Sequence, residues 1–63
     1  MLTVQQMREN LVSYELDFIR SESNTITEQD IIYSMQYIDA LYRSYTDEGI
    51  RKVYSIKLEE LTQ

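Results

Sequence analysis

The stretch from Thr27 to Tyr45, TEQDIIYSMQYIDALYRSY, decides the fold of this chain because it combines a helix start with one continuous apolar face. The Thr27 hydroxyl can accept a hydrogen bond from the backbone amide of Asp30, which is how an N-cap satisfies an otherwise unpaired donor. Apolar residues then recur at alternating spacings of four and three, the pattern that lines one side of an α-helix. These residues are Ile31, Met35, Ile38, Tyr42 and Tyr45. The stretch therefore predicts a helix from about Glu28 to Tyr45.

An earlier segment predicts a first helix. Thr3 and Gln6 form a Thr-x-x-Gln capping box, so this helix should begin after Thr3 and run to about Arg20 or Glu22. Its apolar stripe has heptad spacing and consists of Val4, Met7, Leu11, Tyr14 and Phe18. The polar segment Ser21–Thr25 is a short connection, so the second helix must fold back antiparallel to the first. The result is a helical hairpin.

A third helix is expected after Thr46, which is followed by the acidic residues Asp47 and Glu48 that favour a first helical turn. The apolar face that continues this helix consists of Ile50, Val53, Tyr54, Leu58 and Leu61. Residues 54 to 58 also alternate between apolar and polar, which would suit a strand, but a lone strand has nothing to pair with in this chain. The sequence predicts an all-α fold: an antiparallel helical hairpin plus a short third helix, in one domain spanning residues 1–63.

The first helix has a second apolar side, formed by Val12, Leu16 and Ile19 about 100° around from its heptad stripe. One side can contact the second helix, and the other requires the third helix or another subunit. We expect the third helix to cover it; the alternative is a two-fold homodimer that forms a four-helix bundle. A chain of 63 residues buries only about 60% of its unfolded surface, which also favours self-association or a partner.

Composition narrows the classes of function. The net charge of −5 opposes direct nucleic-acid binding, because phosphate contacts require clustered Lys and Arg. The chain contains no Cys and no His, so it lacks the usual ligands of zinc, iron–sulfur and haem sites, and we expect no metal and no cofactor. No apolar run approaches membrane-spanning length, and no basic-then-apolar leader is present, so we expect a soluble, cytoplasmic protein without membrane contact.

Two of the six tyrosines stand apart from the predicted stripes. Tyr33 and Tyr37 lie one helical turn apart, beside the apolar face of the second helix rather than within it. Rigid amphipathic rings in such positions are enriched at protein interfaces. Two interpretations stay open: the rings pack against the third helix, or they form a surface that binds a partner protein.

The polar side of the second helix carries Gln36, Asp39 and Arg43 at spacings of three and four, which suits an ordinary Asp39–Arg43 ion pair. The string from Gln36 to Tyr45 resembles the signature of the stage-zero sporulation protein E family, which are small helical-hairpin aspartyl-phosphate phosphatases. The matching residues are Gln36, Asp39, Leu41 and Tyr45, with Ile38 a conservative fit. Met35 and Tyr37 stand where the family has serine and glutamate.

The resemblance extends to the helix start at Thr27 and to the first-helix residues Val4, Arg8 and Leu11. It implies that Asp39 carries the key carboxylate and Gln36 the amide, which together orient water beside the phospho-aspartate of a response regulator. Our leading interpretation is nevertheless non-enzymatic: a small acidic regulatory or inhibitory protein that binds another protein through Tyr33, Tyr37, Asp39 and Arg43. The alternative is the phosphatase.

Overall fold

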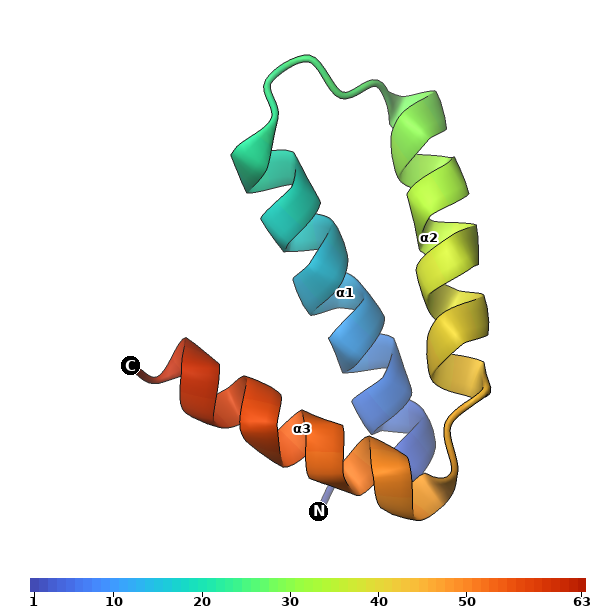
Figure 1. Cartoon of the computed structure of the whole chain (residues 1–63), viewed down its shortest axis with the longest axis vertical. Helices are drawn as coiled ribbons and strands as arrows, with labels where there is room; N and C mark the ends of the chain where they lie inside the picture. Colours follow the sequence, from blue (N-terminus) through green and yellow to red (C-terminus); the bar gives the residue numbers. More distant parts are fainter.

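The computed structural model describes all 63 residues; it contains three α-helices, which make up 79% of the chain, and no strands. Helix α1 spans Val4–Glu22, α2 spans Glu28–Arg43 and α3 spans Asp47–Leu61. Helices α1 and α2 lie side by side and antiparallel, and α3 crosses the end of the pair that is opposite the α1–α2 loop (Figure 1). The all-α prediction is confirmed, and the strand alternative for residues 54 to 58 is wrong. None of the helices has the length and apolar character needed to cross a membrane.

Each helix begins directly after a threonine whose hydroxyl caps it, as the sequence predicts. The Thr27 hydroxyl accepts a hydrogen bond from the Asp30 amide at 3.2 Å, and the Asp30 carboxylate accepts one from the Thr27 amide at 3.2 Å. Thr3 makes the same reciprocal pair with Gln6, and Thr46 caps α3. Because amides at a helix start have no partner within the helix, these hydroxyls fix where each helix begins.

Helix α2 ends at Arg43, two residues before the predicted end at Tyr45. The amides of Ser44 and Tyr45 donate to the carbonyls of Leu41 and Tyr42, three residues back, at 3.2 and 3.3 Å. This tighter turn is a common way for a helix to close its last turn. The chain is thereby free to change direction before α3 begins.

The core lies between the three helices and contains eight buried residues, all of them apolar or aromatic. They are Leu11, Val12, Leu16, Ile31, Ile38, Tyr42, Ile50 and Tyr54. The burial of Val12 and Leu16 shows that the second apolar side of α1 is used in packing. Helix α3 packs against α1, as expected, and the Asn10 amide donates to the Tyr54 hydroxyl at 3.0 Å between them.

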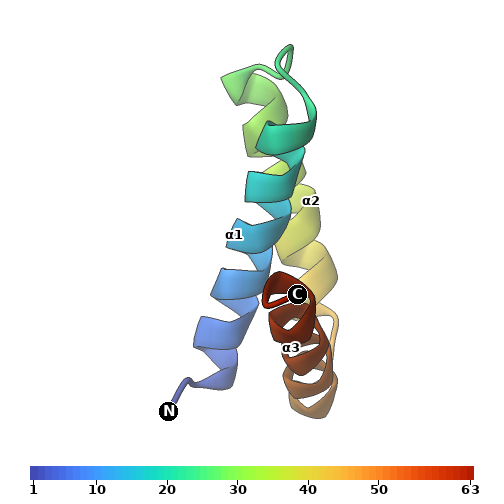
Figure 2. The ribbon, with the colours of Figure 1, turned by 90° about the vertical axis from the view of Figure 1, so that its left-hand side faces the viewer.

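Four residues of the predicted apolar faces are exposed to solvent, namely Phe18 (61%), Met35 (42%), Leu58 (41%) and Leu61 (55%). Leu58 and Leu61 lie in the last turns of α3, whose C-terminal end projects away from the hairpin (Figure 1). A strict heptad stripe drifts around a straight helix by about 20° every seven residues, so Phe18 turns away from the line that α1 buries against α2. Helix α3 covers only the half of the hairpin far from the loop (Figures 1 and 2). Met35 lies at the edge of the contact with α1 because α2 centres its buried face on Ile31, Ile38 and Tyr42.

Candidate functional site

An open groove lies between α1 and α2 and extends toward the α1–α2 loop from Glu15, which Lys57 of α3 contacts. We call it the aromatic groove; its lining residues are Glu15, Ile19, Tyr33, Ser34, Tyr37, Ile38 and Leu41. Helix α1 supplies the first two residues and α2 the other five. The groove exists because two helices that cross without a covering third helix leave a furrow between them.

Tyr33 and Tyr37 form the outer wall of the groove. Tyr33 is 63% exposed and Tyr37 is 73% exposed, so neither ring packs against α3 as one of the two interpretations required. By contrast, the rings of Tyr42 and Tyr45 pack against each other with centroids 5.6 Å apart. The fold therefore uses some of its aromatic side chains in packing and leaves Tyr33 and Tyr37 on the surface.

At the base of the groove, the hydroxyl of the buried Tyr42 and the carboxylate of Glu15 contact each other, and Glu15 also contacts α3. The Glu15 carboxylate accepts a hydrogen bond from the Tyr42 hydroxyl at 3.3 Å and lies 3.6 Å from the Lys57 ammonium of α3. Burial, followed by the negative charge and hydrogen bond of Glu15, raises the pKa of Tyr42 to about 12. Tyr42 therefore remains a neutral donor that orients Glu15 at the junction of the three helices.

A second hollow lies on the other side of α2 and shares no residue with the aromatic groove. Its lining residues are Glu9, Val12, Met35, Gln36 and Asp39. Gln36 and Asp39 thus lie together, as the sequence predicts. Asp39 also pairs with Arg43 at 2.9 Å, and both side chains are largely exposed, so this is an ordinary surface ion pair.

The structure therefore divides the predicted partner-binding residues between two surfaces. Tyr33 and Tyr37 line the aromatic groove, whereas Asp39 lines the opposite hollow with its partner Arg43 beside it. The sequence pattern places all four on exposed parts of one helix but cannot show where α1 lies against it. One continuous contact with all four residues would have to wrap around α2.

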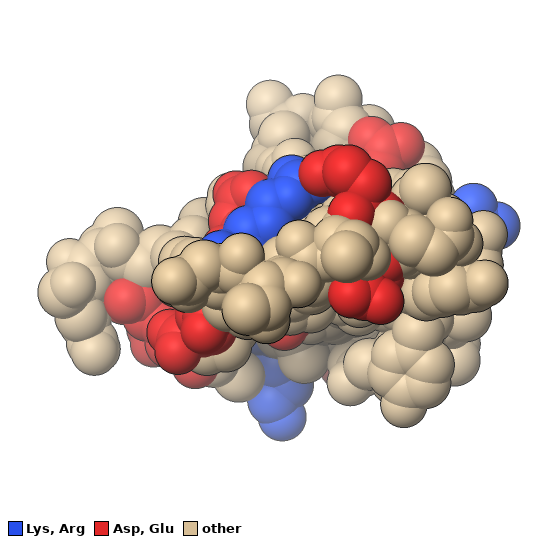
Figure 3. Space-filling view, turned by 90° about the horizontal axis from the view of Figure 1, so that it is seen from above, with Lys and Arg blue, Asp and Glu red and all other residues tan.

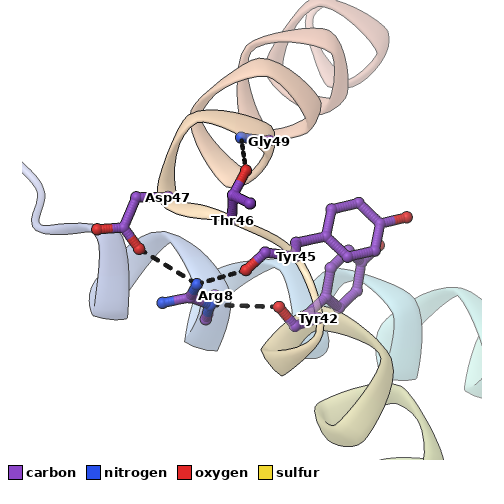
Figure 4. Close-up of polar contacts among 6 residues, drawn as sticks. All are labelled: Arg8, Tyr42, Tyr45, Thr46, Asp47 and Gly49. Atoms are coloured by element: carbon purple, nitrogen blue, oxygen red, sulfur yellow. Dashed lines mark hydrogen bonds and ion pairs between the residues drawn. The ribbon is translucent and has the colours of Figure 1, made fainter.

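Arg8 connects α1 to the end of α2 and the start of α3, a role that the sequence did not reveal. Its guanidinium donates to the carbonyls of Tyr42 and Tyr45 at 3.2 and 2.9 Å, and to the Asp47 carboxylate at 3.3 Å (Figure 4). Carbonyls at a helix end lack partners within the helix and carry partial negative charge, so a cation there is favourable. Arg8 therefore joins α1 to the α2–α3 corner, where α3 begins. In the sequence, the indication of this role is that Arg8 lies next to Met7 in the apolar stripe of the first helix.

The two surfaces offer different groups for contact with another molecule. The structure contains no cluster of three or more side chains that could hold a metal ion. The groove offers apolar area, phenol hydroxyls and one carboxylate that is already paired. The hollow offers an amide and two carboxylates around two apolar residues.

Comparison of the chain with protein-family models, with curated proteins and with solved structures finds no match. The resemblance to the sporulation protein E family thus rests on the sequence alone, mainly on Gln36, Asp39, Leu41 and Tyr45. The structure separates them: Gln36 and Asp39 line the hollow, Leu41 lines the aromatic groove, and Tyr45 is half-buried at the corner.

Proposed function

We propose that this protein is a small acidic regulatory or inhibitory protein that acts in the cytoplasm by binding a partner protein through the aromatic groove. The observation that supports this function best is the exposure of Tyr33 and Tyr37, at 63% and 73%, beside an apolar furrow. Tyrosine provides a large contact area with few rotatable bonds, which is why it is enriched among residues that dominate binding energy.

The uncovered aromatic area is large enough to contribute substantially to binding. If a tyrosine offers about 200 Å², the exposed parts of Tyr33 and Tyr37 together present roughly 270 Å². At about 25 cal/mol per Å², its complete burial would contribute roughly 6–7 kcal/mol before the entropy of association is subtracted. Leu41, which is 44% exposed, extends this area along the groove. A partner protein that binds in the groove would have its own contact surface blocked by this chain.

The test is capture of the partner by wild-type protein and by the double variant Tyr33→Ala/Tyr37→Ala. The tagged chain is used to capture proteins from the native host, the bound protein is identified by mass spectrometry, and it is then purified and bound again. We expect the double variant to keep its helical circular dichroism and to lose at least about tenfold in affinity, because interface aromatics often contribute 2 kcal/mol or more each.

The matched control is Ile32→Ala/Ile56→Ala, which removes two exposed apolar side chains outside the groove. It should bind the purified partner like wild type. Equal binding by wild type and the tyrosine variant would refute the proposal. A parallel loss of helical signal and binding would instead assign the two tyrosines to the core.

A second candidate function is dephosphorylation of a response regulator, and one observation favours it. Gln36 and Asp39 line the same open hollow, and 47% of the Asp39 side chain is exposed, so both groups could approach a phospho-aspartate on a partner. The amide and the carboxylate would orient water beside the partner's own metal ion. For this reaction the Asp39–Arg43 ion pair would have to break, or the phosphoryl group would have to bind beside both side chains.

A further inference from the structure

We propose that the occupant of the aromatic groove is a basic amphipathic helix of the partner protein, about three turns long. This inference rests on the proposed function and names the chemistry of the partner at the same site. It follows from the length of the groove, the position of α3 and the charges along its two edges.

The edges of the groove are two rows of helical residues. The α2 row consists of Asp30, Ser34, Tyr37 and Leu41, which are four, three and four residues apart and therefore lie along one side of the helix. Asp30 is the member nearest the α1–α2 loop. At 1.5 Å per residue this row is roughly 16 Å long, or three helical turns. Because Lys57 of α3 reaches Glu15, α3 borders the far end of the groove and limits the occupant to this length. A helix is the element that packs into the furrow between two others.

The charges along the groove are acidic. The α1 row consists of Glu15, Ile19 and Glu22, and the α2 row begins with Asp30, so the two rows contain three carboxylates and no Lys or Arg. Glu15 lines the groove itself, whereas Glu22 and Asp30 lie about one turn beyond its lining residues, toward the loop. The Asp30 carboxylate also accepts the hydrogen bond from the Thr27 amide. The nearby Lys57 is already bound to Glu15 and, at 3.3 Å, to Glu60. Viewed from the loop, acidic and basic side chains both appear on the surface, with broad uncharged areas between them (Figure 3).

An apolar furrow with acidic edges complements a helix that has a Leu-rich face flanked by Lys or Arg. Apolar contacts at the centre would supply affinity, and the charges at the edges would set orientation and select the partner. The two exposed ring hydroxyls of Tyr33 and Tyr37 can also accept hydrogen bonds from basic side chains at the rim.

A second copy of the chain does not fit this description. Helix α1 has four acidic residues against two arginines, α2 has three against one, and α3 has four against three basic residues. Each helix therefore carries net negative charge, so any helix of another copy would approach the groove with net charge of the same sign as its carboxylates. A two-fold contact would also place the same acidic rows opposite each other, which is unfavourable.

The experiment titrates two synthetic peptides of roughly 11 residues, the length of three helical turns, into the isotopically labelled full chain and follows the amide signals by NMR. Both peptides have the same helix-forming background and the same leucines at i, i+3, i+4 and i+7. One carries Lys beside the leucines and the other carries Glu. We expect the Lys peptide to shift the Ser34, Tyr37 and Leu41 signals and to bind at least about tenfold more tightly than the Glu peptide, with affinity that falls at high salt.

Two variants test the acidic edge. Glu22→Gln should weaken the Lys peptide by roughly two- to fivefold, whereas Asp17→Asn, an exposed acid of the same helix away from the groove, should leave binding unchanged. Equal binding of both peptides in the groove would overturn the basic occupant while leaving the proposed function standing. Absence of shifts in the groove, or shifts confined to the Gln36–Asp39 hollow, would overturn the helix as occupant.

Concentration-dependent shifts of the groove signals without any peptide would show that a second copy is the occupant and would also overturn the inference. Failure of the proposed function is a different result, namely that the Tyr33→Ala/Tyr37→Ala variant binds the purified partner like wild type. The peptide titration and the partner experiment therefore fail independently.

Discussion

Replacement of Arg8 by Met should separate α3 from the hairpin more than any other surface substitution. Arg8 is only 18% exposed in its side chain and donates to two backbone carbonyls and to Asp47. Methionine keeps much of the apolar stem but leaves the Tyr42 and Tyr45 carbonyls without this donor. Loss of charge-assisted hydrogen bonds at a part-buried site costs about 2–4 kcal/mol. A chain of 63 residues has a total stability of roughly 3–9 kcal/mol.

The measurement is urea unfolding followed by circular dichroism, together with amide hydrogen exchange in α3. We expect a lower unfolding midpoint and faster exchange around Tyr54, whose hydroxyl accepts the hydrogen bond from Asn10 of α1. Asp47→Asn is the matched control because it weakens only the exposed arm of the cluster, and it should change stability by less than about 1 kcal/mol. An Arg8→Met variant within about 0.5 kcal/mol of wild type would refute this role of the arginine.

Three further predictions follow from other sites. Ile38→Asp places an unpaired charge at a position that is 8% exposed and should cost several kcal/mol, so a melting curve like that of wild type would contradict the assigned core. The pKa of Tyr42 rises from 10.0 to about 12 in the folded state, so the unfolded chain loses this proton at lower pH than the folded chain. The free energy of unfolding should therefore fall by about 1–2 kcal/mol between pH 10 and 12. Tyr42→Phe should lose that part of the pH dependence in alkaline urea titrations, and an unchanged slope would show that another group causes it. Asp39→Asn should change the free energy of unfolding by less than about 1 kcal/mol. If the protein is a phosphatase, this variant should still bind a labelled phospho-receiver domain but should not shorten the half-life of its acyl phosphate. A wild-type protein that leaves every tested half-life unchanged would exclude the phosphatase function.

The helix starts could be predicted from the sequence because they depend on local chemistry. The Thr27 hydroxyl and the Asp30 carboxylate satisfy each other's amides within one turn, whatever the rest of the chain does. The end of α2 was less predictable. Its last turn tightens at Ser44 and Tyr45, where Arg8, distant in sequence, binds the carbonyls.

The candidate site could be predicted only in part, because it depends on where α1 and α3 lie. The exposure of Tyr33 and Tyr37 was one of two open interpretations, and only the crossing of α3 at the far end of the hairpin decides it. The position of Asp39 in a separate hollow also depends on the side of α2 that faces α1. Phe18 shows the same limit, since its spacing indicates burial but it lies in an open hollow beside Leu61, the last residue of α3, and stays 61% exposed.

The most direct measurement is the NMR footprint of the purified partner on the isotopically labelled full chain. Partner binding through the aromatic groove predicts that the largest amide changes fall at Tyr33, Tyr37 and Leu41, and that signals of the exposed α3 residue Ile56 stay in place. A footprint centred on Gln36 and the hollow on the other side of α2, with the groove signals unmoved, would contradict it.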